Sequence, residues 1–211
     1  MIVAGAGGHA KDLTTLLHTE QKQNLVFFDN VNKKLPPLFL DTYPIISSQE
    51  EVKKHFRKER NYIIGIGGTS AREKIAKILT NLGGELQSII SSHSIIGIKD
   101  IYLGKGLNIM PFVLISNSVH IGDGCLINNR ASLHHDVVVG DFCEIGPSST
   151  LLGGVHIDNY TSIGAGSTVL PDVKIGSNCI IGAGSLITKN VPDNSLVFGS
   201  PGKIIKAISP I

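Results

Sequence analysis

The sequence predicts a chain in two parts, an α/β domain over residues 1–88 and a parallel β-helix over residues 89–195, followed by a short tail over residues 196–211. Two observations carry this prediction. Strand-like and helix-like stretches alternate in the first part, and a six-residue repeat of apolar residues runs through the second. The apolar residues are mostly Ile, Val and Leu, and Trp is absent, which favours many short β elements over helical packing.

The first part is expected to fold as a small βαβαβ unit. Strands are predicted at residues 2–4, 25–28 and 62–66, and helices at 11–18, 47–58 and 71–81. Ser47 or Ser48 caps the second helix, with Glu50 and Glu51 in its first turn. Alternation of this kind predicts a Rossmann-like parallel sheet of three strands, with ligands bound at the carboxyl ends of the strands.

The loop after the first predicted strand, "GAGGHA", carries a nucleotide-binding pattern. Gly5, Gly7 and Ala10 fit G-x-G-x-x-G/A, and Asp29 lies about where such folds place an acid that binds ribose. Glycines there let the backbone approach a phosphate, and the following helix presents free N–H groups to it. Three strands make only half of a dinucleotide fold and no second half follows, so NAD is disfavoured and another nucleotide is left open.

The second part repeats with a period of six residues. From Leu103 onward every sixth residue is Leu, Ile or Val, without exception through Ile187. These fifteen anchors are Leu103, Ile109, Ile115, Ile121, Ile127, Leu133, Val139, Ile145, Leu151, Ile157, Ile163, Val169, Ile175, Ile181 and Ile187. A period of six predicts a parallel β-helix in which each hexad is one short strand and a turn, and three hexads form one coil.

The residue two positions before each anchor is usually small or β-branched, and it is expected to fill the corner of the coil. The three cysteines, Cys125, Cys143 and Cys179, all occupy this position and are multiples of 18 residues apart, so they should form one column with Thr161 between them. We interpret them as buried packing residues. Glycine follows many anchors, where we expect it to permit the turn.

The charge, the apolar runs, the N-terminal segment and the cysteines of the sequence disfavour several classes of protein. The net charge of +2 is too small to indicate a basic surface that binds nucleic acid. No apolar run reaches the roughly 18 residues that a membrane helix needs. The chain opens without the basic segment and cleavage site of a signal peptide. The odd number of cysteines at unrelated spacings indicates neither a disulfide framework nor a zinc knuckle, so a cytoplasmic protein is expected.

Taken together, the repeat, the front stretch "GAGGHAKD" and the tail stretch "GSPGKII" resemble the hexapeptide-repeat sugar acyltransferases, which include sialic-acid O-acetyltransferases and bacterial nucleotide-4-amino-sugar N-acetyltransferases. The resemblance covers essentially the whole chain. It implies a left-handed β-helix, a homotrimer, acetyl-CoA as co-substrate, no metal, and a nucleotide-linked sugar bound on the front domain. The positions that match the family's nucleotide contacts are Gly7, Gly8, His9, Asp29, Gly67 and Ser70, with Arg72 near the phosphates. The alternative is that Asp29 and Arg72 are solvated ends of their elements and that His9 caps a turn.

The candidate catalytic pair is His135 and Asp136, which match the family's histidine followed by an acid. A nucleophilic amine or hydroxyl loses a proton as it attacks a thioester, and a histidine can accept that proton while a carboxylate fixes its tautomer. The anchor Leu133 points inward, so the pair should lie on the outer surface. One coil away stand Gly153 and Gly154, which we expect to leave space and exposed backbone N–H groups for the thioester.

Further contacts follow from the resemblance. His134 is a candidate substrate contact, and Asn128 matches a position near the sugar. The positions that match the CoA groove are Gly153, Ala165 and Ala183, with Ser200, Pro201 and Lys203 at the adenine end. Two positions depart from the usual pattern: Gly202 stands where alanine is common, and Glu144 stands where many relatives have a histidine near the thioester carbonyl. A carboxylate donates a hydrogen bond to that carbonyl only when it is protonated.

Two rival functions are less well supported. A γ-type carbonic anhydrase needs three histidines; His120 and His156 have the first spacing, but the third position is Thr161. A non-catalytic trimeric scaffold would need neither the His-Asp pair nor a nucleotide loop. Within the enzyme reading, N-acetylation of a nucleotide-linked amino sugar leads over O-acetylation of sialic acid, because a free sialic acid would not need the front loops. The sugar, the nucleotide base, the acyl length and the glycan pathway stay open.

Overall fold

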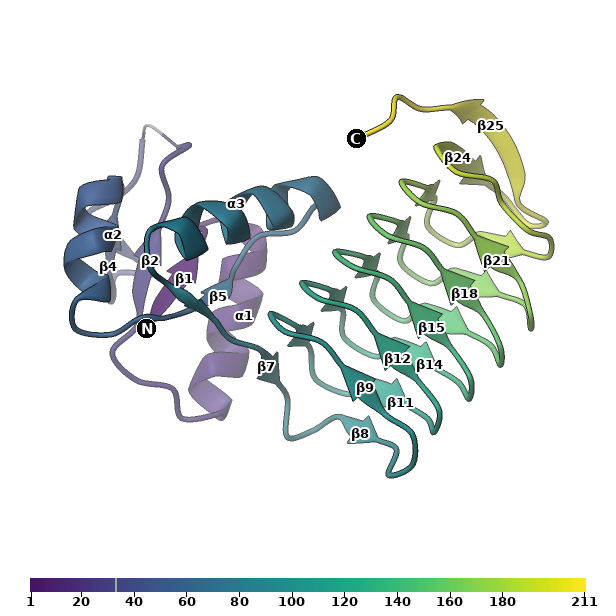
Figure 1. The fold of residues 1–211 in the computed structure, drawn as a ribbon, viewed down its shortest axis with the longest axis horizontal. Helices are drawn as coiled ribbons and strands as arrows, with labels where there is room; N and C mark the ends of the chain where they lie inside the picture. The colour runs from purple at the N-terminus through teal and green to yellow at the C-terminus, as the bar shows by residue number, and fades with distance from the viewer. Residues whose placement is uncertain (33) are drawn as a thin grey trace. The chain divides into compact units, whose positions relative to one another are not determined.

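The structure is a computed structural model that describes residues 1–32 and 34–211, and it divides into two compact units. The first unit comprises residues 1–67 and 71–89, and the second comprises residues 68–70 and 90–211. Figure 1 shows helices around a sheet in the first unit and a stack of coils in the second. Among the described residues, no helix combines the length and the apolar character needed to cross a bilayer.

The first unit is built on a six-stranded sheet with the order β3-β4-β2-β1-β5-β6. Its elements are β1 (Ile2–Ala4), α1 (Gly8–Thr19), β2 (Val26–Phe28), β3 (Leu38–Phe39), β4 (Tyr43–Ile46), α2 (Gln49–Phe56), β5 (Asn61–Ile64), α3 (Thr69–Asn81) and β6 (Glu85–Leu86). The predicted count of three strands is wrong. The missed strands β3, β4 and β6 have two to four residues, and β4 contains Pro44, a residue that argues against a strand.

Helices α2 and α3 cover one face of this sheet. Val52 and Phe56 of α2 and Leu79 of α3 pack into one buried cluster with Phe28 and Tyr62 of the strands. The cap of α2 is Ser48, not Ser47: the Ser48 hydroxyl accepts from the backbone N–H of Glu51, and the Glu51 carboxylate accepts from the backbone N–H of Ser48. This reciprocal capping box fixes the start of α2 and holds the Glu51 carboxylate against the helix end.

The second unit is a parallel β-helix with three sheets, which we call I, II and III. Sheet I contains β7 (Ile89–Ile90), β10 (Asn108–Ile109), β13 (Leu126–Ile127), β16 (Glu144–Ile145), β19 (Ser162–Ile163), β22 (Ile180–Ile181), β24 (Ser195–Phe198) and β25 (Lys203–Ala207). Sheet II contains β8 (Ile95–Ile96), β11 (Leu114–Ile115), β14 (Ser132–Leu133), β17 (Thr150–Leu151), β20 (Thr168–Val169) and β23 (Leu186–Ile187). Sheet III contains β9 (Tyr102–Leu103), β12 (His120–Ile121), β15 (Val138–Val139), β18 (His156–Ile157) and β21 (Lys174–Ile175).

All fifteen predicted anchors end a strand, and each coil is 18 residues long. Ile109 pairs with Ile127, and Ile127 pairs with Ile145, so equivalent residues stack directly above one another. Fourteen anchors are buried, and Leu103, in the first coil, packs against their cluster from a partly exposed position. Two rungs were missed, β7 and β8, because the step from Ile96 to Leu103 is seven residues and breaks the period.

The turns of the β-helix repeat a left-handed backbone conformation at every sixth residue. From Gly106 to Gly184, the residue three positions after each anchor has φ between +50° and +71°, and most of these residues are not glycine. The glycines directly after the anchors have a different cause. A Cβ at Gly146, for example, would lie 2.6 Å from the carbonyl oxygen of Ile163 in the next coil. The expectation that these glycines permit the turn is therefore wrong: they allow adjacent coils to approach.

The cysteine column lies inside the prism as predicted. Cys125, Cys143 and Cys179 are fully buried, and each thiol points at a backbone carbonyl of a neighbouring turn at 3.0–3.1 Å. Thr161, between them, donates from its hydroxyl to the carbonyl of Gly176 at 2.7 Å. Thiol and hydroxyl thus perform the same bridging task at the corner, and burial raises the pKa values of Cys143 and Cys179 above the usual range for thiols.

We expect none of the three thiols to react with a chromogenic aryl disulfide while the protein is folded, because the reagent needs an accessible thiolate. After unfolding in denaturant, all three should react. The measurement is the absorbance of the released thiolate with and without denaturant. Rapid reaction of even one equivalent in the native protein would show that the column is open to solvent.

Candidate active site

His135 and Asp136 occupy the turn between sheets II and III, on the outer surface of the prism. His135 Nδ1 lies 2.8 Å from Asp136 Oδ2, and both side chains are about two-thirds exposed, at 68% and 63%. Asp136 has a φ of +60°, one of the recurring left-handed turn positions, which aspartate tolerates better than most residues. A carboxylate only accepts hydrogen bonds, so the pair assigns the ring proton to Nδ1 and leaves a lone pair on Nε2.

The glycine one coil away receives the His135 ring. A Cβ at Gly153 would lie 2.6 Å from Nε2 and 3.0 Å from Nδ1 of His135. The first distance is too short for a real Cβ contact, so a side chain at position 153 would displace the ring. The expectation of empty space over the imidazole is wrong, since the ring itself fills it. The backbone N–H of Gly154, expected to be exposed, donates to the carbonyl of His135 at 3.0 Å. Gly153 therefore fixes where the imidazole lies.

The other predicted contacts of the second unit lie on more than one corner of the prism. His134 shares the corner between sheets II and III with His135 and is half-buried, whereas Asn128, Ala165 and Ala183 lie on the corner between sheets I and II. Both alanines are exposed. Sheet II separates the two corners, so one prism does not bring Ala165 and Ala183 to His135.

Glu144, at the start of β16 in sheet I, is also separate from the His135 corner. Its carboxylate accepts the backbone N–H of Gly68 at 2.9 Å, a contact within the second unit. The hydrogen bond uses the carboxyl group of Glu144 as an acceptor and so holds the side chain away from the His135 corner.

The tail forms a cavity at the last coil. Ser200 and Pro201 are exposed in the turn between β24 and β25, and Lys203 begins β25. A cavity of about 290 Å³ is lined by the loop after β23 and by the tail, including Lys189, Asn190, Gly202 and Lys203. A Cβ at Gly202 would lie 2.7 Å from the Ile187 side chain, so the glycine found where alanine is common keeps the tail close to the last rung.

The glycine loop of the first unit is open where a ligand could approach. A Cβ built on Gly7 or Gly8 meets no atom within 4 Å, and Gly7 caps α1 without a side-chain hydrogen bond. Gly5 differs: with a φ of +122°, it has no room for a Cβ beside the Ile66 side chain, and the carbonyl of Gly65 lies 3.0 Å away. The loop thus combines one glycine required by packing with two that expose the helix N-terminus.

A half-buried histidine, His9, and a fully buried arginine, Arg72, lie beside this loop. Arg72, in α3, is 0% exposed and donates from Nη1 to the carbonyl of Ile66 at 2.8 Å, so the reading of it as a solvated helix end is wrong. Burial, together with the nearby Arg72 charge, lowers the pKa of His9 to about 4. His9 Nε2 is buried and has no hydrogen-bond partner, which is the kind of orphaned polar atom that a bound ligand satisfies.

The pKa of His9 predicts a loss of stability in mild acid. Its value in the folded state lies below the ordinary 6.5, so the unfolded chain binds the proton first. The contribution of neutral His9 to the free energy of unfolding is fully present above pH 6.5 and is lost as the pH falls toward about 4. Between pH 7 and pH 4.5, titration of His9 should lower the free energy of unfolding of the parent protein by on the order of 2–3 kcal/mol. The variant His9→Gln should lack this part of the loss. Denaturant titrations at both pH values measure it.

The matched control for this measurement is His18→Gln, on the exposed surface of the same helix. It should leave the difference between pH 7 and pH 4.5 unchanged. Equal acid sensitivity of the parent protein and His9→Gln would show that His9 does not titrate in this range.

The remaining first-unit candidates have defined structural positions. Asp29 follows β2, and its Oδ1 accepts the backbone N–H groups of Val31 and Asn32, both at 3.0 Å. The carboxylate thus already orders its own loop. Gly67 lies in the loop after β5, and Ser70 is the second residue of α3, half-buried and grouped with the second unit.

The three positions of the carbonic anhydrase pattern do not form a metal site. His120 and His156 lie on the outer face of sheet III, and His120 Nε2 is 3.3 Å from Asp100 Oδ1. Thr161 is buried inside the prism and donates to a backbone carbonyl. Over residues 1–32 and 34–211, no group of three or more His, Cys, Asp or Glu side chains is placed to hold a metal.

Comparison with known families identifies both units. Residues 1–79 match the PglD N-terminal domain, and residues 118–153, 136–170 and 154–189 match the bacterial transferase hexapeptide repeats. The chain belongs to the hexapeptide-repeat sugar acyltransferases. The predicted fold class, an α/β domain followed by a left-handed parallel β-helix, is confirmed with it. Curated proteins give no match.

Solved structures of similar proteins cover 97% of the chain. PerB from Caulobacter crescentus, in complex with CoA and GDP-perosamine, is 28% identical over 97% of this chain and 96% of its own, with a TM-score of 0.86. The acetyltransferase domain of PglB from Neisseria gonorrhoeae, in complex with acetyl coenzyme A, is 25% identical over 97% and 98%, with a TM-score of 0.86. WeeI from Acinetobacter baumannii is 25% identical over 97% and 98%, with a TM-score of 0.88.

Proposed function

We propose that this acyltransferase moves the acetyl group of acetyl-CoA to the amino group of a nucleotide-linked 4-amino sugar, with His135 as general base. The observation that carries the proposal is the His135–Asp136 pair at 2.8 Å, held over Gly153 on the surface of the prism. It is supported by the similarity to PerB, whose structure contains both CoA and GDP-perosamine.

The chemistry follows from the assigned tautomer. The amine nitrogen of the sugar attacks the thioester carbonyl carbon, and the C–N bond forms as the C–S bond breaks. His135 Nε2 accepts the proton that the nitrogen loses, while Asp136 holds Nδ1–H and stabilises the imidazolium. The sulfur leaves as the CoA thiolate, which can take the same proton from His135. The base is regenerated without a metal.

The front loop fits the nucleotide in this proposal. Gly7 and Gly8 expose the N-terminus of α1, and Arg72 supplies a buried positive charge nearby. His9 Nε2 is neutral at cellular pH and without a partner, so it can bond a polar atom of the nucleotide. In the second unit, the tail cavity with Lys189 and Lys203 fits the nucleotide end of CoA.

A homotrimer with sites between subunits is part of the proposal. Its support is that the proposed catalytic residue and the proposed CoA contacts lie on different corners of the prism. His135 lies between sheets II and III, whereas Ala165 and Ala183 lie between sheets I and II. A CoA groove that uses both corners therefore needs a second copy of the chain. Apolar side chains exposed on the first coils, such as Ile95 and Phe112, fit an interface between copies. We expect a mass in dilute solution of three times 22.4 kDa. A fully active monomer would contradict it.

The compartment proposed for this reaction is the cytoplasm. The three cysteines are free thiols, as is usual for proteins of a reducing compartment.

A panel of substrates tests the function. UDP-, GDP- and dTDP-linked 4-amino sugars are offered with acetyl-CoA, and free thiol is followed. We expect turnover of at least one of them and none of free sialic acid. Turnover of sialic acid alone would replace the proposal by O-acetylation. No turnover of any acceptor, with CoA bound and the protein folded, would favour a non-catalytic scaffold.

A further inference from the structure

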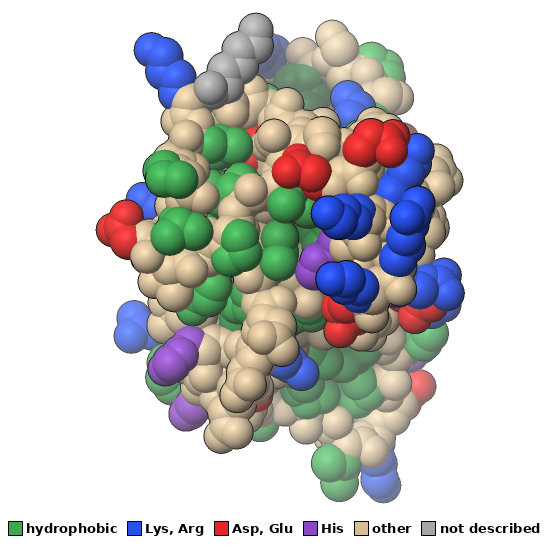
Figure 2. Space-filling model, turned by 90° about the vertical axis from the view of Figure 1, so that its left-hand side faces the viewer, with side chains coloured by type: hydrophobic (Ala, Val, Ile, Leu, Met, Phe, Trp, Pro, Cys, Tyr) green, Lys and Arg blue, Asp and Glu red, His purple; other side chains and the backbone are tan. Residues whose placement is uncertain are grey.

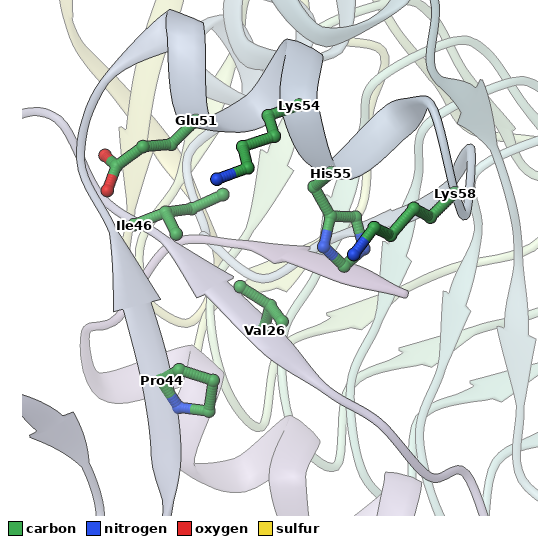
Figure 3. Close-up of a pocket in the computed structure, with 7 residues that line it drawn as sticks. All are labelled: Val26, Pro44, Ile46, Glu51, Lys54, His55 and Lys58. Atoms are coloured by element: carbon green, nitrogen blue, oxygen red, sulfur yellow. The ribbon is translucent and has the colours of Figure 1, made fainter.

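The first unit has a second cavity, away from its glycine loop, which we call the α2-flank pocket. It has a volume of about 300 Å³ and is lined by Val26, Pro44, Ile46, Glu51, Lys54, His55 and Lys58. Figure 3 shows the side chains of α2 on one side of the pocket and those of β2 and β4 on the other. None of these seven residues belongs to the proposed nucleotide site.

The floor of the pocket is apolar. Pro44 and Ile46 are two residues apart on β4 and therefore point to the same face of the sheet, and Val26 lies on the adjacent strand β2. Val26 and Ile46 are half-buried and Pro44 is exposed. A ligand in the pocket would remove this apolar surface from water.

The rim carries positive charge. Lys54 of α2 and Lys58, two residues after the end of α2, are exposed, and neither forms an ion pair in the described part of the chain. Lys53 of α2, in contrast, pairs with Glu50 at 3.3 Å. The Glu51 carboxylate also lines the pocket, but its oxygen Oε2 accepts from Ser47 and Ser48 at the helix cap. Figure 2 shows basic side chains gathered on this side of the molecule, next to apolar surface.

His55 adds a polar group between the floor and the rim. Its Nε2 is buried without a hydrogen-bond partner, although the ring as a whole is partly exposed. Burial, followed by the positive charge of the N-terminal amine, lowers the pKa of His55 from its ordinary value; Glu59 opposes this shift, and Lys58 adds to it. A neutral imidazole offers one N–H donor and one acceptor, and a buried ring nitrogen without a partner is costly until a ligand supplies one.

We propose that the α2-flank pocket binds a small organic anion, a carboxylate or phosphate carried on a compact apolar body. The two lysines match the anion, His55 can donate to it, and the apolar body covers Val26, Pro44 and Ile46. An inorganic ion would leave the floor in water, and a neutral apolar molecule would make no use of the charges of Lys54 and Lys58. The volume fits the lower end of small-molecule sites.

The test uses phenyl phosphate as the probe and the methyl NMR signals of Val26 and Ile46 in the full chain as the readout. These signals separate the pocket from the glycine loop, which can also bind phosphate. We expect saturable shifts of both signals. Inorganic phosphate and benzyl alcohol, which carry the two halves of the probe, should bind at least about tenfold more weakly. If either binds as tightly as phenyl phosphate, the combined anionic and apolar ligand is wrong.

Two variants in and just after α2 separate the pocket from general charge effects. The double variant Lys54→Gln/Lys58→Gln should weaken the binding of phenyl phosphate at least about tenfold. Lys53→Gln removes one charge from α2 outside the pocket and should leave binding unchanged. The absence of shifts in the parent protein, or an equal loss in Lys53→Gln, would overturn the site. All these lysines are exposed, and the remaining methyl signals report whether the fold is intact.

Discussion

Replacing His135 by alanine should lower kcat by about 10² to 10⁴, the usual contribution of a positioned general base. The affinities for nucleotide sugar and CoA should change little, because neither the glycine loop nor the tail is altered. The measurement is steady-state kinetics with saturating acetyl-CoA, beside direct binding of both substrates. Asp136→Asn should act in the same direction and less strongly, since Asp136 orients the ring and does not accept the proton from the substrate.

His134→Ala is the matched control, because His134 stands next to His135 on the same corner of the prism. It should retain most of the activity. If His134→Ala abolished turnover while His135→Ala left it near the parent value, the base would be assigned to the wrong residue, and the role of Gly153 would be wrong with it.

Gly153→Ala should be nearly as damaging as the loss of His135, although it removes no functional group. The added Cβ would lie 2.6 Å from Nε2, so the imidazole must swing out of the position in which Asp136 holds it. The neighbouring atom belongs to a side chain, so the ring can move and the coil can fold as before. We expect a loss of kcat of about 10² or more, with the thermal unfolding temperature and CoA affinity close to those of the parent.

Pro171→Ala serves as the control for Gly153→Ala, because it changes an exposed residue on the same corner one coil further from His135. Its kcat should match that of the parent. Unchanged activity of Gly153→Ala would show that the imidazole does not need its present position, and the general-base assignment would lose its geometric support.

The β-helix could be predicted in detail because its determinants are local and periodic. Each anchor pairs with the equivalent residue of the neighbouring coils, as Ile127 does with Ile109 and Ile145. An apolar residue at every sixth position therefore specifies the core. The prediction failed where the period changes, between Ile96 and Leu103. The first unit was less predictable: β3 and β6 have two residues each, too few to show alternation, and they form because neighbouring strands lie beside them.

The candidate site was predicted in its residues but not in its arrangement. The sequence places Gly153 one coil from His135, yet only the structure shows that the ring occupies the space of the missing side chain. The buried state of Arg72 could not be read from sequence either, because its position in the first turn of α3 suits exposure equally well. In both cases the decisive fact is how side chains pack across elements, which local patterns do not encode.

The 18-residue register restricts how a protein of this shape can change its length during evolution. The loss of one residue within the coils would turn every later anchor from the inside of the prism to another position. It would also place a different residue at each turn position that requires a left-handed backbone conformation. Insertion or duplication of a whole coil keeps all columns aligned and only lengthens the prism. Irregular lengths are tolerated at the ends, and there the chain has them, before Leu103 and after Ile187. Homologues should therefore differ in their number of coils and in their end segments, and rarely in the length of a rung.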